Sequence, residues 1–198
     1  TVLVLRREGR LEVRTNGLPE ASIFPKDAQP GRELVAQWLT VLPAAARPGL
    51  RNMLVVGLGG GLALERVPAS VESIDVVELE PEVLRANQRF AAWRDRDPLA
   101  DPRLRVRLAD ARSALLLSTE RYDAIVSQPS HPWGAGASHL YTREFFVLAR
   151  DRLAPDGVFV QWMNPRFIDE PLLRTLVATL RETFPEVRIY WSRRRQSL

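Results

Sequence analysis

Four glycines within five positions follow an apolar stretch and form the first chemically suggestive pattern of the chain. The stretch Leu54-Val55-Val56 runs into Gly57, Gly59, Gly60 and Gly61. Glycine lets a backbone turn tightly and approach a ligand, and a helix that starts there presents free N–H groups to a polar or anionic ligand. The pattern therefore predicts either a ligand-binding turn or a purely structural one.

An acidic residue, Glu78, ends the next apolar run and favours the ligand-binding alternative. It stands 21 residues after Gly57, where a carboxylate can accept hydrogen bonds from both hydroxyl groups of a ribose. The competing explanation is a charge at a helix N-terminus, which suits Glu80 and Glu82 better. Leu62 occupies the position of the third glycine in a dinucleotide fingerprint, and this argues against binding of NAD.

A second acidic residue, Asp110, directly follows a third apolar run, and Ala111 begins the helical segment after it. An acid at this point lies at the same edge of a sheet and either accepts a hydrogen bond from an adenine amino group or caps the helix. Together the glycines, Glu78 and Asp110 predict a nucleoside site that needs no triphosphate.

Apolar runs of strand length alternate with helical periods from Leu50 onward, and this alternation decides the fold class. Repeated β-α units predict an α/β fold, with a Rossmann-like parallel sheet, helices on both faces and a ligand crevice at the carboxyl ends of the strands. The expected strands are 53–56, 73–79, 104–108, 122–127, 158–162 and 187–191, and the expected helices are 62–66, 81–93, 111–117, 142–153 and 170–184.

The beginning of the chain has a different pattern. Short β-prone runs at 2–5 and 11–13 flank Glu8-Gly9-Arg10 and predict a β-hairpin, and the run 21–24 is a candidate for one more strand.

Residues 32–42 then place their apolar side chains on one helical face, and Pro43 together with Pro48-Gly49 is expected to close that helix. We therefore expect an N-terminal β-hairpin and helix in residues 1–49 and a Rossmann-like nucleoside-binding domain in residues 50–198.

The composition excludes several classes of protein. A chain of 198 residues with 45% hydrophobic and 26% charged residues is typical of one soluble globular domain with a small appendage, and is unlike disordered chains, collagen or coiled coils. Because the chain has no cysteine, disulfides and thiolate metal sites are excluded. With only two histidines, we expect no metal.

The charge pattern bears on partners and location. The formal net charge is +4, and the 27 arginines, against the single lysine Lys26, are mostly scattered among acids, so a nucleic-acid partner is disfavoured. The longest near-apolar run, 53–64, is too short to span a membrane. We see no targeting segment and expect a cytoplasmic protein.

Read in order, the motifs resemble those of the spermidine synthase (polyamine aminopropyltransferase) family, especially a bacterial spermidine-synthase-like branch with a Pro-Ser-x-Pro-Trp loop. The family also begins with a β-hairpin element ahead of a Rossmann-like class I methyltransferase-type domain, so the resemblance covers nearly the whole chain. The motifs are Val55–Gly61, Val76–Glu80, Ala109–Ala111, Tyr122–Val126, Pro129–Trp133 and Leu140–Phe146.

The resemblance implies a sulfonium nucleoside as donor substrate, either S-adenosylmethionine or its decarboxylated form, with methylthioadenosine as a further ligand. It places the four glycines and Glu78 around the donor, with Glu78 on the ribose, and Asp110 with Ala111 on the adenine side. In the family, a propylamine group passes from the sulfonium to an amine nitrogen of a small-molecule acceptor. A carboxylate must hold the cationic amine and take its proton before the nitrogen attacks.

The family's acids for this step are replaced at the matching positions. Two aspartates of the loop after the fourth strand fall on Gln128 and His131, and the acid of the glycine motif falls on Gly60. His131 is either a base near neutral pH or an ordinary loop residue. We retain Gln128 and His131 as degenerate catalytic candidates.

At the acceptor end, the resemblance points to Arg32, Trp133 and Tyr141 as substrate-binding residues. Arg32 falls in the pair that lines the family's diamine channel and brings a positive charge, and Trp133 either caps the pocket or anchors its loop. Because a pocket for putrescine needs negative charge, we expect a poor putrescine aminopropyltransferase. Replacing Gln128 and His131 by Asp should raise any trace activity.

The sequence therefore favours a spermidine-synthase-like transferase with an unassigned acceptor. A small-molecule methyltransferase and a catalytically silent nucleoside-binding or assembly module are the alternatives. A hairpin this small is unstable alone, so we also expect it, or a sheet edge, to join two copies in a homodimer.

Overall fold

The structure, a computed structural model, describes residues 1–26, 35–94, 96–130, 132–134, 136–164 and 168–191. The N-terminal segment folds into an antiparallel sheet in the order β1-β2-β3. Its strands are β1 (Val2–Arg7), β2 (Arg10–Thr15) and β3 (Leu18–Ile23). The expected hairpin is present, and the candidate strand at 21–24 is part of β3.

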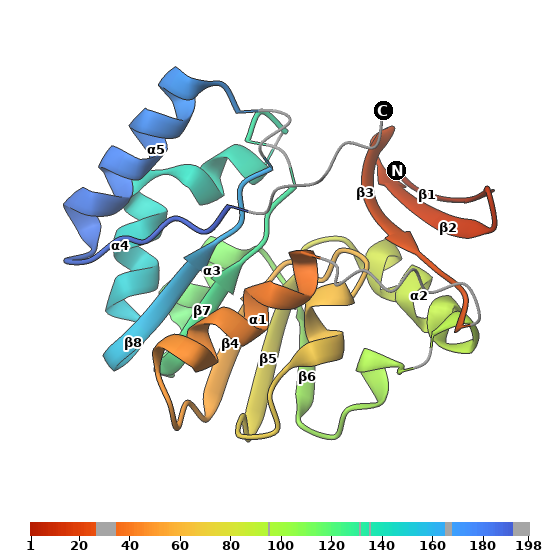
Figure 1. The fold of residues 1–198 in the computed structure, drawn as a ribbon, viewed down its shortest axis with the longest axis horizontal. Helices are drawn as coiled ribbons and strands as arrows, with labels where there is room; N and C mark the ends of the chain where they lie inside the picture. The colour runs from red at the N-terminus through yellow and green to blue at the C-terminus, as the bar shows by residue number, and fades with distance from the viewer. Residues whose placement is uncertain (27–34, 95, 131, 135, 165–167, 192–198) are drawn as a thin grey trace.

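A parallel sheet of five strands forms the centre of the remaining chain (Figure 1). Its order is β6-β5-β4-β7-β8, and every neighbouring pair is parallel, as the β-α alternation predicts. The strands are β4 (Asn52–Val56), β5 (Ser73–Glu78), β6 (Leu104–Leu108), β7 (Tyr122–Ser127) and β8 (Leu153–Gln161).

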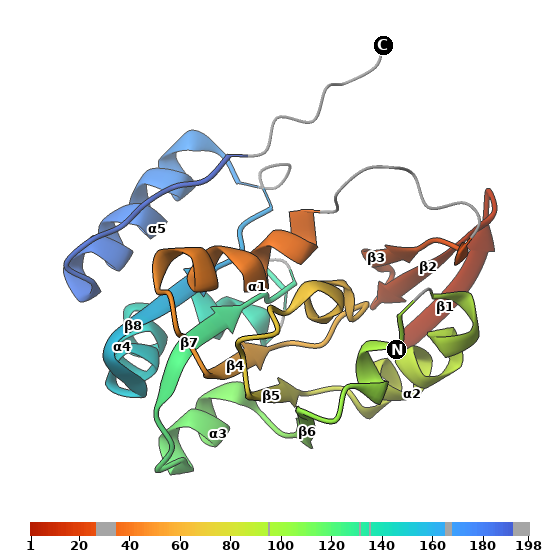
Figure 2. The same ribbon diagram turned by 60° about the horizontal axis from the view of Figure 1, so that its bottom comes forward.

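Helices cover both faces of this sheet (Figure 2). One face carries α1 (Val35–Ala46) and the short 3-10 helix η2 (Leu62–Arg66). The other carries α3 (Ala111–Leu117), α4 (Arg143–Asp151) and α5 (Glu170–Thr183). The remaining helices are α2 (Pro81–Phe90), η3 (Ala91–Trp93), η4 (Pro98–Ala100) and η5 (Ala137–Tyr141). No described helix is long and apolar enough to cross a bilayer.

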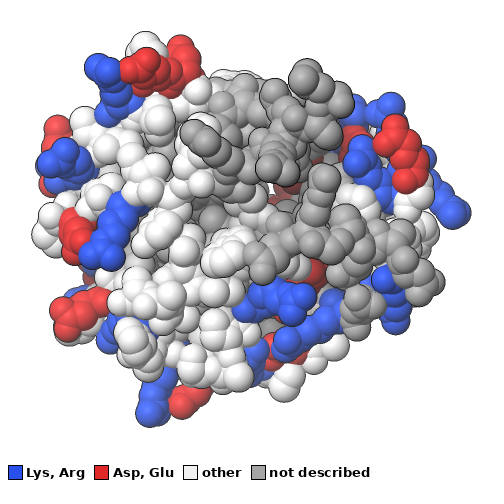
Figure 3. Space-filling model, viewed as in Figure 1, with Lys and Arg blue, Asp and Glu red and all other residues white. Residues whose placement is uncertain are grey.

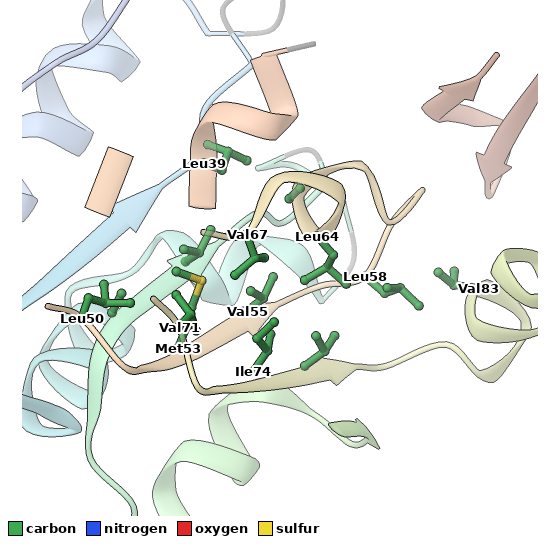
Figure 4. Close-up of a cluster of buried hydrophobic side chains, with 14 residues drawn as sticks. Leu39, Leu50, Met53, Val55, Leu58, Leu64, Val67, Val71, Ile74 and Val83 are labelled. Carbon is green, nitrogen blue, oxygen red and sulfur yellow. The ribbon is translucent and has the colours of Figure 1, made fainter. Parts of the chain in front are cut away.

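The central strand β4 shows why the sheet is buried on both sides. Met53 and Val55 belong to the cluster that packs under α1 and η2 (Figure 4), whereas Leu54 and Val56 face α3 and α4. All four side chains are buried. A strand covered by helices on both faces needs apolar residues at every position, so it appears in the sequence as a continuous apolar run.

The N-terminal sheet packs against α2, beside the parallel sheet (Figures 1 and 2). Val13 of β2 and Ile23 of β3 form a buried cluster with Ala86 and Phe90 of α2. The small sheet therefore stabilises itself on its own chain, which a three-stranded sheet of this size requires.

One expectation about a helix end is only partly right. Pro43 does not close its helix, because α1 continues to Ala46 with Pro43 buried inside it, and the helix ends just before Pro48-Gly49. A proline within a helix removes one backbone hydrogen bond. Burial of the Pro43 ring offsets part of that cost, and the sequence pattern alone does not reveal the burial.

The strand expected at 187–191 is absent. Residues 184–191 are irregular, and Ile189, Tyr190 and Trp191 are 60–62% exposed. A β-prone run becomes a strand only where a neighbouring edge offers hydrogen bonds. No described strand pairs with this run.

A buried acid joins β5 to β7 across the sheet. The Tyr122 hydroxyl donates to Asp75 Oδ2 at 2.9 Å, and Arg105 Nε donates to Oδ1 at 2.8 Å. Burial first, and then the Asp75 carboxylate, raise the pKa of Tyr122 from its ordinary 10.0 to about 12. The fold therefore holds this phenolic proton more tightly than the unfolded chain does.

We predict that Tyr122→Phe lowers the free energy of unfolding by about 1–3 kcal/mol at neutral pH, because it leaves a buried Asp75 oxygen without its donor. The raised pKa means that the unfolded chain ionises first, so this stabilisation is complete below about pH 10 and is lost as the pH rises to about 12. Urea unfolding of both proteins across that range measures the difference, and a gap independent of pH would contradict the prediction.

Candidate functional site

Glu78 ends β5 and is held in place by two backbone groups. Its Oε2 accepts the N–H of Leu58 at 2.7 Å, and its Oε1 accepts the N–H of Glu80 at 2.9 Å. The residue is 8% exposed. Because an ionised carboxylate accepts about four hydrogen bonds, acceptor capacity remains for a ligand beside the glycine turn.

Two buried polar side chains hold the glycine turn after β4 from beneath. Asn87 of α2 donates to the Gly59 carbonyl at 2.8 Å, and Arg94 donates to the Gly60 carbonyl and to the Asn87 side-chain oxygen. Gly61 has a φ of 72°, and a Cβ atom there would lie 2.7 Å from Arg94 Nη1. Both observations require a glycine at position 61, and the two bonded carbonyls fix the peptide planes of the turn.

Asp110 follows β6, next to the end of β5, since Ala109 donates its N–H to the Glu78 carbonyl at 3.0 Å. One Asp110 oxygen accepts the Ser113 N–H at 2.8 Å and so caps α3. The capping alternative is therefore realised, and Asp110 is exposed while Ala111 is buried. The second Asp110 oxygen remains a candidate acceptor for a base amino group.

Leu79 lies directly after Glu78 and is 58% exposed. A large apolar side chain directly after the buried Glu78, at the carboxyl end of β5, offers a surface suited to the flat face of a nucleobase.

Gln128 follows β7 and ties this strand to the glycine turn. Its Nε2 donates to the Gly57 carbonyl at 2.6 Å, and its backbone N–H donates to the Val56 carbonyl at 3.0 Å. An aspartate has no side-chain N–H to donate, so it could not form the first of these bonds. Gln128, which we expected at the position of a family acid, therefore makes a structural contact in this chain.

Gly60 leaves room for a strand of the other sheet. A Cβ atom on Gly60 would overlap the Ala21 methyl group of β3 and would lie 3.2 Å from Ile23 Cδ1. Packing alone requires glycine here, because its φ is not in the left-handed region. An acid at position 60 has no space as long as β3 lies where it does.

A residue that the motifs did not indicate, Glu20 of β3, lies near Glu78. The buried Tyr141 donates its hydroxyl to the Ser130 carbonyl at 3.3 Å, and burial together with the charge of Glu20 raises the pKa of Tyr141. Burial is also the main cause of the raised pKa of Glu20, which the Ser130 side chain opposes and Glu78 reinforces. Glu20, Glu78, Ser130 and Tyr141 are thus neighbours.

The structure places the other predicted residues as follows. Trp133 is exposed. Arg32 and His131 lie outside the described residues. Among the residues that are described, no three histidines, aspartates or glutamates are arranged to hold a metal ion.

An open groove of about 750 Å³ lies beside this site, between α3 and α4. Its lining includes Asp110, Ser113 and Leu148, but neither the glycine turn nor Glu78. We therefore do not place the nucleoside in it.

In the view of Figure 3, acidic atoms are visible in the middle of the face, set back from the surface.

Sequence reasoning missed Glu20, Asn87 and Arg94. A signal for Glu20 exists in Pro19, because a proline inside a strand marks a sheet edge or a bulge. Asn87 and Arg94 carry no such signal, since their function depends on α2 packing beneath the glycine turn.

The sheet order β6-β5-β4-β7-β8, with helices on both faces, defines a Rossmann-like α/β fold. The chain matches a solved spermidine synthase in complex with the transition state analogue AdoDATO with a TM-score of 0.77 at 20% identity, covering 93% of this chain and 66% of that one. The spermidine synthase from Thermotoga maritima gives a TM-score of 0.72 at 20% identity, covering 93% and 65% of the two chains. The expected fold class is confirmed.

The chain belongs to the spermine/spermidine synthase family, because the spermine/spermidine synthase domain matches residues 33–196. It is 34% identical over 152 residues to a polyamine aminopropyltransferase of Nitrosomonas europaea, covering 75% of this chain and 46% of that protein. It is 39% identical over 132 residues to polyamine aminopropyltransferase 1 of Streptomyces coelicolor, covering 64% and 25%. The chain thus spans a quarter to just under half of the length of these relatives.

We predict that Gly60→Ala destabilises the protein by about 1–3 kcal/mol, because the added methyl group overlaps Ala21. Combining it with Ala21→Gly should recover part of the loss, since the two methyl groups then no longer compete. Denaturant unfolding of wild type, both single variants and the double variant measures this coupling. Additive effects would show that β3 does not press on the turn.

Proposed function

We propose that this chain binds an S-adenosyl nucleoside at the carboxyl ends of β4, β5 and β6, and acts as a spermidine-synthase-like transferase on a small-molecule acceptor. One observation carries the proposal: the buried Glu78 carboxylate is anchored to the glycine turn at 2.7 Å and still has acceptor capacity. A ribose with two adjacent hydroxyl groups suits such a carboxylate.

The neighbouring side chains suit the rest of a nucleoside. Leu79 offers an apolar surface for the base, and Asp110 offers an acceptor for its amino group. The glycine turn allows the backbone to approach the 5′ end of the ribose. S-adenosylmethionine, decarboxylated S-adenosylmethionine and methylthioadenosine share this nucleoside, so the residues named so far suit all three.

The transfer proposed is a displacement at carbon. The acceptor nitrogen attacks the carbon bound to the sulfonium sulfur, the C–N bond forms as the C–S bond breaks, and the sulfur leaves as a neutral thioether. The nitrogen must first give up a proton. Gln128 cannot take that proton, so we expect putrescine to be a poor acceptor and leave the acceptor unassigned.

A catalytically silent nucleoside-binding module is the second candidate. The hydrogen bond from Gln128 to the Gly57 carbonyl favours this candidate. Gln128, which we expected at the position of a catalytic acid, uses its side chain to hold the glycine turn instead. A small-molecule methyltransferase uses the same donor site. Mass spectrometry separates the three: with S-adenosyl donors and amine acceptors, transfer of a propylamine group, transfer of a methyl group, or no transfer.

We predict that Glu78→Ala weakens binding of methylthioadenosine by about 1.5–3 kcal/mol, the range of a charge-assisted hydrogen bond. Glu80→Ala is the matched control, because it removes the same charge two residues away and should leave the affinity nearly unchanged. Calorimetry with methylthioadenosine and both S-adenosyl donors measures these affinities. An unaltered affinity in Glu78→Ala would remove Glu78 from the site, and a wild type that binds none of the three ligands would overturn the proposal.

A further inference from the structure

Glu20 is the extra residue of a β-bulge. In the pairing of β2 with β3, Val13 lies opposite Ala21 and the next residue, Arg14, lies opposite Pro19. One step along β2 therefore corresponds to two steps along β3, and Glu20 has no partner in the register. A bulge bends a strand and redirects a side chain, and bulges are frequent beside active sites.

The redirected side chain lies among residues from three other elements. Ser130 comes from the loop after β7, Glu78 from the end of β5, and Tyr141 from the end of η5. Glu20 is partly buried there, and its interaction with Glu78 is repulsive. Two neighbouring carboxylates, one buried and one partly buried, form a local environment that favours a cation.

The position of β3 connects Glu20 to the loss of an acid elsewhere. Ala21, the neighbour of Glu20, occupies the space above Gly60 that an acidic side chain would need. Gln128, the other described position matched to an acid, is engaged with the Gly57 carbonyl. Glu20, the neighbour of Ala21, thus adds a second carboxylate beside Glu78 from the strand that covers the turn.

We propose that Glu20 binds a primary ammonium group of a substrate next to the 5′ end of the nucleoside. This inference rests on the proposed function, because it takes the nucleoside to lie against Glu78 and the glycine turn. It deepens that function by assigning a residue of the N-terminal sheet, Glu20, to the binding of a substrate ammonium group. Two molecules can bring the group: a donor with an aminopropyl tail, or an amine acceptor.

An ammonium group suits the charge and the hydrogen-bond acceptors around Glu20. It carries three N–H donors, which can reach the Glu20 carboxylate and the neighbouring Ser130 oxygen atoms together. Pairing also relieves the repulsion between Glu20 and Glu78. Methylthioadenosine has neither an ammonium nor a sulfonium charge, so its affinity should not depend on Glu20.

The test compares wild type with Glu20→Gln, which keeps the shape of the side chain and removes its charge. Calorimetry measures three affinities: methylthioadenosine alone, decarboxylated S-adenosylmethionine alone, and putrescine with methylthioadenosine saturating. We expect methylthioadenosine to bind both proteins equally and at least one ammonium ligand to bind the variant about 10- to 100-fold more weakly, the loss typical of a charge-assisted bond. The affected ligand identifies the source of the ammonium group.

Glu8→Gln is the matched control. Glu8 lies in the β1–β2 turn of the same sheet, and its side chain is 79% exposed beside Arg10, so this variant removes the same charge far from the crevice. Unchanged affinities for both ammonium ligands in Glu20→Gln overturn the inference, as does a parallel loss for methylthioadenosine or an equal effect of Glu8→Gln. A wild type that fails to bind methylthioadenosine instead overturns the proposed function, and this inference with it.

Discussion

The contact between β3 and the glycine turn after β4 is the constraint on which both the fold and the candidate site depend. The Ala21 methyl group fills the space above Gly60, and Asn87 and Arg94 bind the carbonyl groups of the same turn from below. The turn therefore lies between two parts of the chain. One is β3 of the N-terminal sheet, and the other is formed by Asn87 of α2 and Arg94, which follows η3. Glu78 is joined to the same turn, because Leu58 donates its N–H to the Glu78 carboxylate.

Elements whose signals are local follow directly from the sequence. The run 52–56 forms the central strand because helices bury both of its faces, and Pro81 begins α2 because a helix needs no N–H at its first position. Pro43 and the run 187–191 behave differently, since the first depends on burial against the sheet and the second on a pairing edge. Neither condition can be read from neighbouring residues.

The residues of the candidate site also fall into two groups, those with a local signal in the sequence and those that depend on packing. The glycines, Glu78 and Asp110 sit where parallel strands end, and that position can be counted along the chain. Glu20 reaches the same crevice from another sheet, 58 residues before Glu78 in the sequence, through a bulge and a packing contact. Motifs locate residues by counting along one strand and the next, whereas a carboxylate contributed by a different sheet is visible only in three dimensions.

Because Glu20 is the extra residue of the bulge, the number of residues in β3 determines whether its carboxylate is present beside Glu78. Ala21 contacts the glycine turn, and Ile23 packs against α2. Glu20 has no partner in the register between β2 and β3. Deleting a single residue from the start of β3 would restore regular pairing without altering any core contact. Insertion and deletion in an edge strand, rather than substitution within the parallel sheet, would then decide whether the site carries one carboxylate or two.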